Sequence, residues 1–288
     1  MVLEHLIFGT ALVGSGIASV YDLKTTEVPN WVFYAMLVVG VPAVAINAFI
    51  NGSFDSFAFA GITGLALFGF GYIMYRTGQW GGADMVLLGI MGFLIPPSVA
   101  IFQSSLVFPS GVSFLFNVFM VGAVYMIGYA IVFAARNKEV MRKFFIGVKA
   151  SSRLILIVTV ALLIALTAIM SYLNSLLGGV LTTSEMVRSV TLPVLLTVGF
   201  FVVYKLAKAV ENFGFRKKVP VSELRVGDML LDEKKLVGVT QAQINKIRKS
   251  GPRSVWIKEG VRFAPAFPLA LLFTFYLGDA IMIMRFLF

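Results

Sequence analysis

Two aspartates stand at the ends of apolar segments, where carboxylates are rare and costly. Asp22 follows an apolar run over 3–21, and Asp84 precedes another over 85–102. An ionisable side chain at the edge of a hydrocarbon layer indicates a functional site by default. Two carboxylates a few ångströms apart share one proton, so the charged one can activate water while the neutral one protonates a carbonyl oxygen. This pair of residue types therefore indicates acid–base hydrolysis.

The composition of the whole chain indicates a polytopic membrane protein. Of the 288 residues, 59% are hydrophobic and 13% are charged, whereas soluble domains average about 25% charged residues. So little charge cannot cover a water-facing surface of this size, which excludes an ordinary soluble enzyme and a disordered protein. The sequence has no cysteine and a single histidine, His5, which excludes disulfides, thiolate metal sites and histidine metal cages. We expect no metal and no cofactor.

Eight apolar segments are long enough to cross a membrane, which takes about 20 residues. They lie at about 3–21, 31–50, 57–75, 85–102, 112–135, 154–176, 190–210 and 265–285. Nearly all of the Lys and Arg residues lie in alternate connections, at 22–30, 76–84, 136–153 and 205–262. By the positive-inside rule these connections are cytoplasmic and both termini lie outside. The net charge of +10 then reflects orientation in the cell membrane and contact with lipid, not nucleic-acid binding.

This topology places Asp22 and Asp84 at the same, cytoplasmic, depth. On topology alone, two other roles are equally reasonable for them. Both aspartates could simply be charges at helix ends, and Asp84 could cap the helix that follows it, because Asp is a favoured N-cap residue and stabilises the positive end of the helix dipole.

A polar segment before the last apolar run predicts a small cytoplasmic subdomain. The segment 211–264 is too charged to enter a membrane. Thr240 and Gln243 resemble a capping box that opens a helix ending near Ser250, and short strands are predicted at 226–231 and 254–258. The predicted fold is an all-α polytopic membrane protein with about eight transmembrane helices and this α+β subdomain before the last helix. The expected domains are 1–110 (a core with both aspartates), 111–210 (further helices and a basic cytoplasmic loop), 211–264 (the subdomain) and 265–288 (the last helix).

The residues around the two aspartates form two motifs. Residues 22–30 read Asp-Leu-Lys-Thr-Thr-Glu-Val-Pro-Asn, which resembles the D-x-K-x-x-x-[IV]-P-N signature after the first helix of type IV prepilin peptidases. Residues 81–84 read Gly-Gly-Ala-Asp and resemble the second signature of that family. Residues 258–267 look like the segment that leads such proteins into their last helix. The chain resembles the archaeal branch, the prepilin and preflagellin (archaellin) peptidases, which are aspartyl membrane proteases of the GxGD group.

The resemblance implies that Asp22 and Asp84 are the catalytic pair of a membrane endopeptidase. Its partners would be pilin-like or archaellin precursors, from which it would remove leader peptides at the cytoplasmic face. The motif residues expected to support the pair or position the substrate are Lys24, Pro29, Asn30, Gly81, Gly82 and Ala83. Lys24 could hold a substrate carbonyl or simply set orientation, whereas Pro29 and Asn30 are expected to begin the second helix.

The chain departs from the bacterial members of this family in two respects. Ala83 replaces a glycine of the bacterial motif, and a hydrophobic residue there resembles the archaeal version. Bacterial members often carry an insert with paired Cys-x-x-Cys motifs and a second, methyltransferase activity. Here only a few residues separate Asp22 from the second apolar run, and there is no cysteine. We therefore expect a peptidase without methyltransferase activity.

Two alternative functions compete with this interpretation. A presenilin-like protease would also use two aspartates, and Pro-Leu-Ala-Leu at 268–271 faintly resembles that group, but such proteins carry the aspartates on consecutive helices. A proton-coupled transporter could use Asp22, Asp84 and Asp279 as a relay. Asp279 lies about fourteen residues into the predicted last helix, about 20 Å from the cytoplasmic face, and we expect it to make a polar contact between helices.

Overall fold

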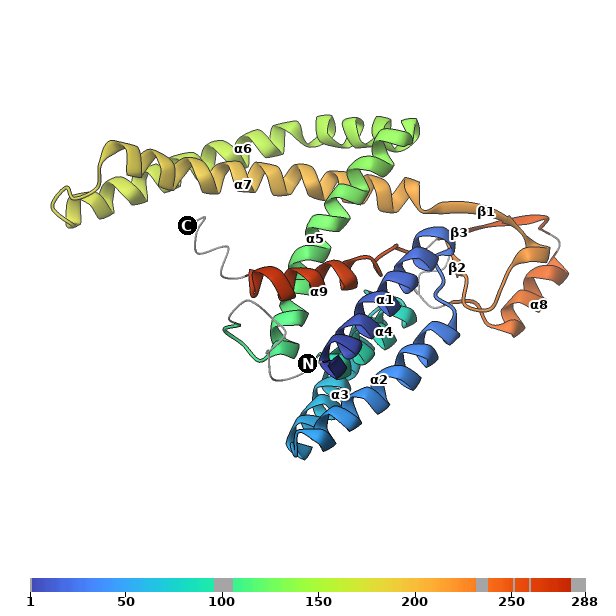
Figure 1. The fold of residues 1–288 in the computed structure, drawn as a ribbon. Helices are drawn as coiled ribbons and strands as arrows, with labels where there is room; N and C mark the ends of the chain where they lie inside the picture. Colours follow the sequence, from blue (N-terminus) through green and yellow to red (C-terminus); the bar gives the residue numbers. More distant parts are fainter. Residues whose placement is uncertain (1, 96–105, 232–237, 251, 259, 281–288) are drawn as a thin grey trace. The chain divides into compact units, whose positions relative to one another are not determined.

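The computed structural model describes residues 2–95, 106–231, 238–250, 252–258 and 260–280 (Figure 1). The chain forms two compact units. The first comprises residues 1–126 and 217–288, and the second comprises residues 127–216.

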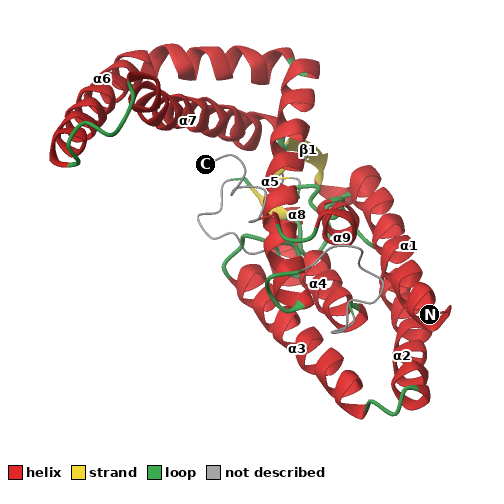
Figure 2. Cartoon of the chain, turned by 60° about the vertical axis from the view of Figure 1, so that its left-hand side comes forward, coloured by secondary structure: helices red, strands yellow, loops and turns green. Residues whose placement is uncertain are grey.

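The first unit is built around four helices that follow one another in the chain. They are α1 (Val2–Thr25), α2 (Asn30–Ile50), α3 (Phe54–Arg76) and α4 (Gly82–Leu94). Each of α1, α2 and α3 packs against α4 (Figure 2). Small residues allow the close approach of α3 to α4, as is usual for helices in membranes: a Cβ atom placed on Gly71 would lie 3.0 Å from the Cα of Met85. The beginning of α5 (Ser110–Arg136) and helix α9 (Ala266–Leu277) complete the helical part of this unit.

The subdomain of the first unit contains a three-stranded sheet with the order β1-β3-β2. The strands are β1 (Arg216–Pro220), β2 (Met229–Leu230) and β3 (Ser254–Lys258). Strands β2 and β3 are antiparallel, with Leu230 opposite Ile257. A 3₁₀ turn, η2 (Val221–Glu223), follows β1, and helix α8 (Gln241–Ser250) precedes β3. The small hydrophobic core of the subdomain contains Val219, Leu224, Val239 and Ile244.

The second unit consists of the end of α5 and two long helices. Helix α6 (Lys138–Leu176) and helix α7 (Thr183–Ala209) pack against each other, and a short π-helical turn, η1 (Val210–Gly214), follows α7. Where they meet η1, these helices share a small core that includes Ala134, Val140 and Phe215.

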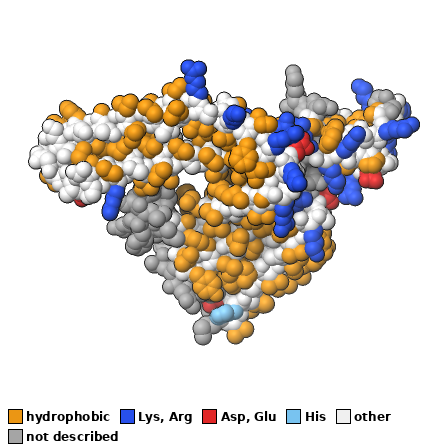
Figure 3. Space-filling model, turned by 90° about the horizontal axis from the view of Figure 1, so that it is seen from above, with side chains coloured by type: hydrophobic (Ala, Val, Ile, Leu, Met, Phe, Trp, Pro, Cys, Tyr) orange, Lys and Arg blue, Asp and Glu red, His pale blue; other side chains and the backbone are white. Residues whose placement is uncertain are grey.

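The chain is a polytopic all-α membrane protein with a small α+β part, as predicted. Among the described residues, six helices are long and apolar enough to cross a membrane, namely α1, α2, α3, α5, α6 and α7 with η1. Helices α4 and α9 are apolar but shorter. Apolar side chains cover much of the face shown in Figure 3, and large apolar residues are exposed along every long helix. Such apolar surfaces are unfavourable in water and are suited to contact with lipid.

Most of the predicted elements lie where the sequence placed them, and several differ. The basic connection 136–153 was expected to be a loop, but only Asn137 separates α5 from α6. This prediction is wrong because Lys and Arg are good helix formers, so charge marks a membrane boundary without ending a helix. The side chain of Asn137 accepts hydrogen bonds from the N–H groups of Glu139 and Val140, and thereby starts the new helix at once.

The last helix was predicted to run to residue 285, but α9 ends at Leu277. Gly278 has a φ of 79°, a conformation that glycine adopts without a steric penalty and that ends a helix. Residues 281–285 of the predicted segment lie outside the described residues, as do residues 96–102 of the segment that holds α4.

The subdomain predictions are confirmed in part. The Thr240 N–H donates to Gln243 Oε1 at 2.8 Å, and the Gln243 N–H donates to Thr240 Oγ1 at 3.4 Å, which is the expected capping box of α8. Strand β3 has the predicted bounds, whereas β2 covers only two residues of 226–231. Strand β1 was not predicted, because its three consecutive basic residues lack the apolar alternation that identifies a strand.

Candidate functional site

The two aspartates singled out by the sequence lie close together in the first unit. Asp22 is in the last turn of α1, and Asp84 is in the first turn of α4. These two helices are in contact, and the two carboxylates are near enough for their charges to interact. Only 7% of Asp22 and 8% of Asp84 is exposed. Chain folding thus brings the two motifs together at one end of the α1–α4 bundle.

The carboxylate of Asp84 is held by its own helix. Its Oδ2 atom accepts a hydrogen bond of 3.0 Å from the Gly81 N–H. Gly81 is the N-cap residue of α4, so Asp84 lies in the first turn and not at the cap position that the helix-end interpretation assigned to it. A Cβ atom on Gly81 would lie 3.3 Å from this same Oδ2 atom. A glycine at this position therefore leaves room for the carboxylate.

The carboxylate of Asp22 is held by a distant part of the chain. Its Oδ2 atom accepts a hydrogen bond of 2.9 Å from the N–H of Ala264, which precedes α9. Among the described residues, neither aspartate accepts a hydrogen bond at Oδ1. Each carboxylate thus has one oxygen fixed by a backbone N–H and one oxygen available to water or to a substrate.

An aromatic cluster packs beside the second motif. Trp80, which immediately precedes Gly81, stacks on Phe119 of α5 with ring centroids 5.6 Å apart. The same indole contacts Phe263 at 5.5 Å and Phe267 at 6.1 Å. Sequence reasoning did not select Trp80, although its position directly before the Gly-Gly pair was a usable signal. The cluster provides an apolar wall next to the first turn of α4.

The remaining motif residues shape the two loops. Pro29 is the N-cap residue of α2 and Asn30 is its first residue, so the prediction that they begin the second helix is confirmed. Lys24 is exposed in the last turn of α1, where a positive charge stabilises the negative end of the helix dipole. Gly82 is the first residue of α4, and the side chain of Ala83 packs against the core.

Asp279 belongs to a different polar cluster. It is 3% exposed, and its Oδ2 atom accepts a hydrogen bond from the Val107 N–H. Next to it, Asn117 of α5 donates to Thr274 Oγ1 and to the Gly278 carbonyl, both at 2.8 Å, and accepts from the Ala280 N–H at 2.9 Å. Asn117 thus joins α5 to the end of α9. Asp279 itself lies after the end of α9 and binds a residue that precedes α5, so the prediction that it makes a contact from within the last helix is wrong.

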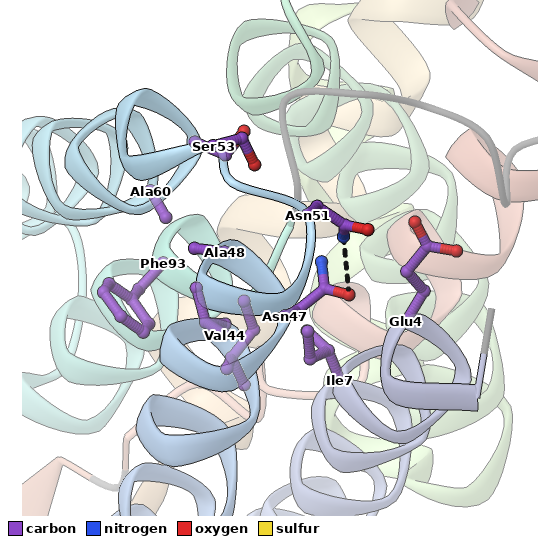
Figure 4. Close-up of a pocket in the computed structure, with 11 residues that line it drawn as sticks. Glu4, Ile7, Val44, Asn47, Ala48, Asn51, Ser53, Ala60 and Phe93 are labelled. Atoms are coloured by element: carbon purple, nitrogen blue, oxygen red, sulfur yellow. Dashed lines mark hydrogen bonds between the residues drawn. The ribbon is translucent and has the colours of Figure 1, made fainter.

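A cavity of about 350 Å³ lies at the other ends of α1 and α2 (Figure 4). Glu4 contributes from the first turn of α1, and Asn47 and Asn51, linked by a hydrogen bond of 3.2 Å, contribute from the end of α2. The residues that line it belong to neither motif. Within the described part of the chain, no three His, Asp or Glu side chains are grouped as metal ligands would be.

Comparison with known proteins identifies the region that carries the two aspartates. Residues 10–127 match the type IV leader peptidase family. The matched region contains both motifs, and it confirms the resemblance seen in the sequence. The chain is 35% identical over 92 residues to the preflagellin peptidase of Methanococcus voltae, a match that covers 32% of this chain and 39% of that protein.

A second relative is the prepilin peptidase EppA of Methanothermobacter thermautotrophicus, which is 31% identical over 125 residues. This match covers 43% of the present chain and 30% of EppA. The chain therefore spans well under half the length of either relative. No solved structure matches the chain.

Proposed function

We propose that this protein is an aspartic membrane endopeptidase that removes leader peptides from pilin-like or archaellin precursors. The observation that carries the proposal is the meeting of Asp22 and Asp84, which come from separate motifs of the leader-peptidase region and lie buried and adjacent at one end of a helix bundle. Two carboxylates close enough for their charges to interact can share one proton between them.

The chemistry follows from the unequal protonation of the pair. The ionised carboxylate takes a proton from a water molecule as that water attacks the scissile carbonyl carbon. The neutral carboxylate donates its proton to the carbonyl oxygen, and the C–N bond then breaks with proton transfer to the departing amine. The backbone donors at Oδ2 of each aspartate fix the two carboxylates, so that both Oδ1 atoms remain available for these transfers.

The position of the pair suits a bond that lies at a membrane boundary. Such a reaction needs water on one side and an apolar wall on the other. The aromatic cluster around Trp80 supplies an apolar surface beside α4. The charge pattern of the connections supports a cytoplasmic position for this end of the helices, which also carries the exposed Lys24 and Glu27.

The names of the two relatives support precursors of archaellins or pilins as the substrate class. The absence of cysteine in the sequence supports the further expectation that the chain has no methyltransferase activity. The transporter gains no specific supporting observation, because Asp279 accepts its hydrogen bond from Val107, away from the two motifs.

A leader-processing assay tests the proposal. Membranes that contain the protein are mixed with a pilin-like precursor, and wild type is compared with Asp22→Asn and Asp84→Asn. Asp55→Asn is the matched control, because Asp55 is an exposed aspartate in the first turn of α3. We expect processing to fall by at least about a hundredfold in each of the first two variants and to persist in the control.

The position of the cut separates the proposal from its closest rival. Sequencing the new N-terminus should place cleavage between the leader and the apolar segment of the precursor. A cut within the apolar segment would favour the presenilin-like activity. Full processing by either Asn variant, with the protein inserted normally, would refute the catalytic pair.

A further inference from the structure

The segment that leads from β3 into the first turn of α9 contacts both motifs, although it is far from them in sequence. We call residues 260–267 the bridging segment. Its Ala264 N–H donates to the Asp22 carboxylate at 2.9 Å. Two residues earlier, Arg262 Nε donates to the carbonyl oxygen of Leu23 at 3.1 Å. The bridging segment therefore binds both the side chain of Asp22 and the end of the helix that carries it.

The same segment also binds the second motif through its aromatic residues. The rings of Phe263 and Phe267 pack on Trp80, directly before the Gly-Gly-Ala-Asp motif. Ala264, between them in sequence, is buried. The hydrogen-bond donor for one aspartate is thus flanked by residues that contact the loop of the other.

Helix α5 holds the bridging segment from a third direction. The hydroxyl of Tyr125 donates to the Arg262 carbonyl at 2.9 Å. Gly122, one turn earlier, leaves room for the Phe263 ring, which would lie 2.8 Å from a Cβ atom there. Tyr125 and Gly122 therefore fix the backbone immediately before the Ala264 N–H.

We propose that the bridging segment positions Asp22 for the reaction, with Ala264 as the direct positioning residue and with Arg262 and Tyr125 holding it in place. This inference rests on the proposed function. The Ala264 N–H belongs to a backbone that is fixed by contacts on both sides, and a backbone donor has no rotamers. It therefore fixes a carboxylate more firmly than a side-chain donor would. Catalysis depends steeply on such alignment, because a displacement of about 1 Å can cost roughly a hundredfold in rate.

The arrangement also connects the subdomain to the catalytic pair. Strand β3 ends at Lys258, and the bridging segment begins two residues later. A displacement of the sheet would therefore be transmitted through a short connection to the donor of Asp22. The subdomain would act on the rate of the reaction through the bridging segment, without contributing a catalytic residue.

The first test measures kcat and KM separately for precursor processing. Tyr125→Phe removes only the hydroxyl that holds Arg262. Arg262→Gln removes the bond to Leu23 together with a positive charge that acts on Asp22, so Tyr125→Phe is the cleaner of the two variants. Tyr34→Phe and Arg253→Gln are matched controls at exposed positions. We expect kcat to fall roughly fivefold in each test variant, which corresponds to one lost hydrogen bond, while KM and both controls stay within about twofold of wild type.

A change in KM alone, or unchanged kinetics in both test variants, would overturn the positioning role. A merely structural role predicts a loss of active protein with normal kcat per folded molecule. The concentration of folded enzyme is therefore determined in each preparation before kcat is calculated.

The second test does not require peptidase activity. Hydrogen–deuterium exchange is followed in peptides that cover residues 260–267, in wild type, Asp22→Ala and Asp84→Ala. Loss of its acceptor should speed exchange of the Ala264 amide roughly tenfold in Asp22→Ala, whereas Asp84→Ala should leave it unchanged. Equal exchange in all three proteins would overturn the inference. If the three proteins show this exchange pattern but the wild type processes no precursor, the proposed peptidase function is overturned and the link between Ala264 and Asp22 stands.

Discussion

The two compact units bury their helices to very different extents. In the first unit, α1 buries residues along its whole length, including the polar Ser15, Ser19 and Asp22. In the second unit, Val140 is the only buried residue of the 39-residue helix α6. The first unit thus has an interior in which a polar site can be enclosed, whereas most of α6 presents apolar side chains outward. The match to leader peptidases, residues 10–127, falls almost entirely in the first unit.

This difference indicates separate roles for the two units. Chemistry that needs desolvated carboxylates can be carried out only where several helices surround them. The apolar surface of α6 and α7 is suited to contact with lipid or with other membrane segments. Substitutions of the same type should therefore have larger effects in the first unit than in the second, and the first two predictions below test this expectation. The last two sharpen the account of the first unit alone.

The largest effect on stability is expected at the buried polar cluster of the first unit. Asn117→Ala removes bonds to the Thr274 hydroxyl, the Gly278 carbonyl and the Ala280 N–H at once, all of them in the buried interior of the first unit. We expect a loss of about 3 kcal/mol in the free energy of unfolding. Asn137→Ala in the second unit removes a helix N-cap and should cost only about 1 kcal/mol. Denaturant unfolding in detergent measures both, and equal losses would contradict the comparison.

A smaller effect is expected where α3 approaches α4. Gly71→Ala places a methyl group 3.0 Å from the backbone of Met85, so the helices must separate. Overpacking of this kind costs about 1–3 kcal/mol. Gly199→Ala in α7 meets no atom within 4 Å and should leave stability unchanged or slightly raise it, since Ala favours helix over Gly. Thermal unfolding measures the stability of both variants. The expectation is wrong if Gly71→Ala leaves the stability unchanged.

The loop after Asp22 contains one strained residue. Thr26 has a φ of 59°, which a β-branched side chain rarely adopts. Thr26→Gly should relieve this strain and raise the free energy of unfolding by up to about 1 kcal/mol. Thr25→Gly, one residue earlier and inside α1, is the control and should lower stability. If Thr26→Gly is as destabilising as the control, the strain does not exist in the protein.

The smallest effect is expected for the ion pair between the subdomain and the first motif. The guanidinium Nη1 atom of Arg225 lies 3.6 Å from Oε2 of Glu27, and both side chains are mostly exposed. Such pairs contribute less than about 1 kcal/mol, so Arg225→Gln should hardly change stability or processing. A large loss of processing in this variant, in protein that remains folded, would contradict this expectation and show that the ion pair is required for activity.

The sequence predicted the helices and the two aspartates because both depend on local signals. Apolar runs and the charge of their connections identify membrane segments, and the motif residues around Asp22 and Asp84 are contiguous. The hydrogen bond from Ala264 could not be predicted in this way, because donor and acceptor are 242 residues apart and a backbone N–H has no residue signature. The start of α6 at Lys138, directly after Asn137, was missed because charge reports the membrane boundary and not the end of a helix.

The central claim is that Asp22 and Asp84 form one site, and cross-linking tests it most directly. The chain has no cysteine, so Asp22→Cys combined with Asp84→Cys provides the only two thiols. A short bifunctional thiol reagent, added to membranes, should link the two residues within the folded protein. The control pair, Asp22→Cys with Asp55→Cys, should remain unlinked. Efficient linking of the first pair alone is the predicted result, and failure to link it in folded protein would contradict the account.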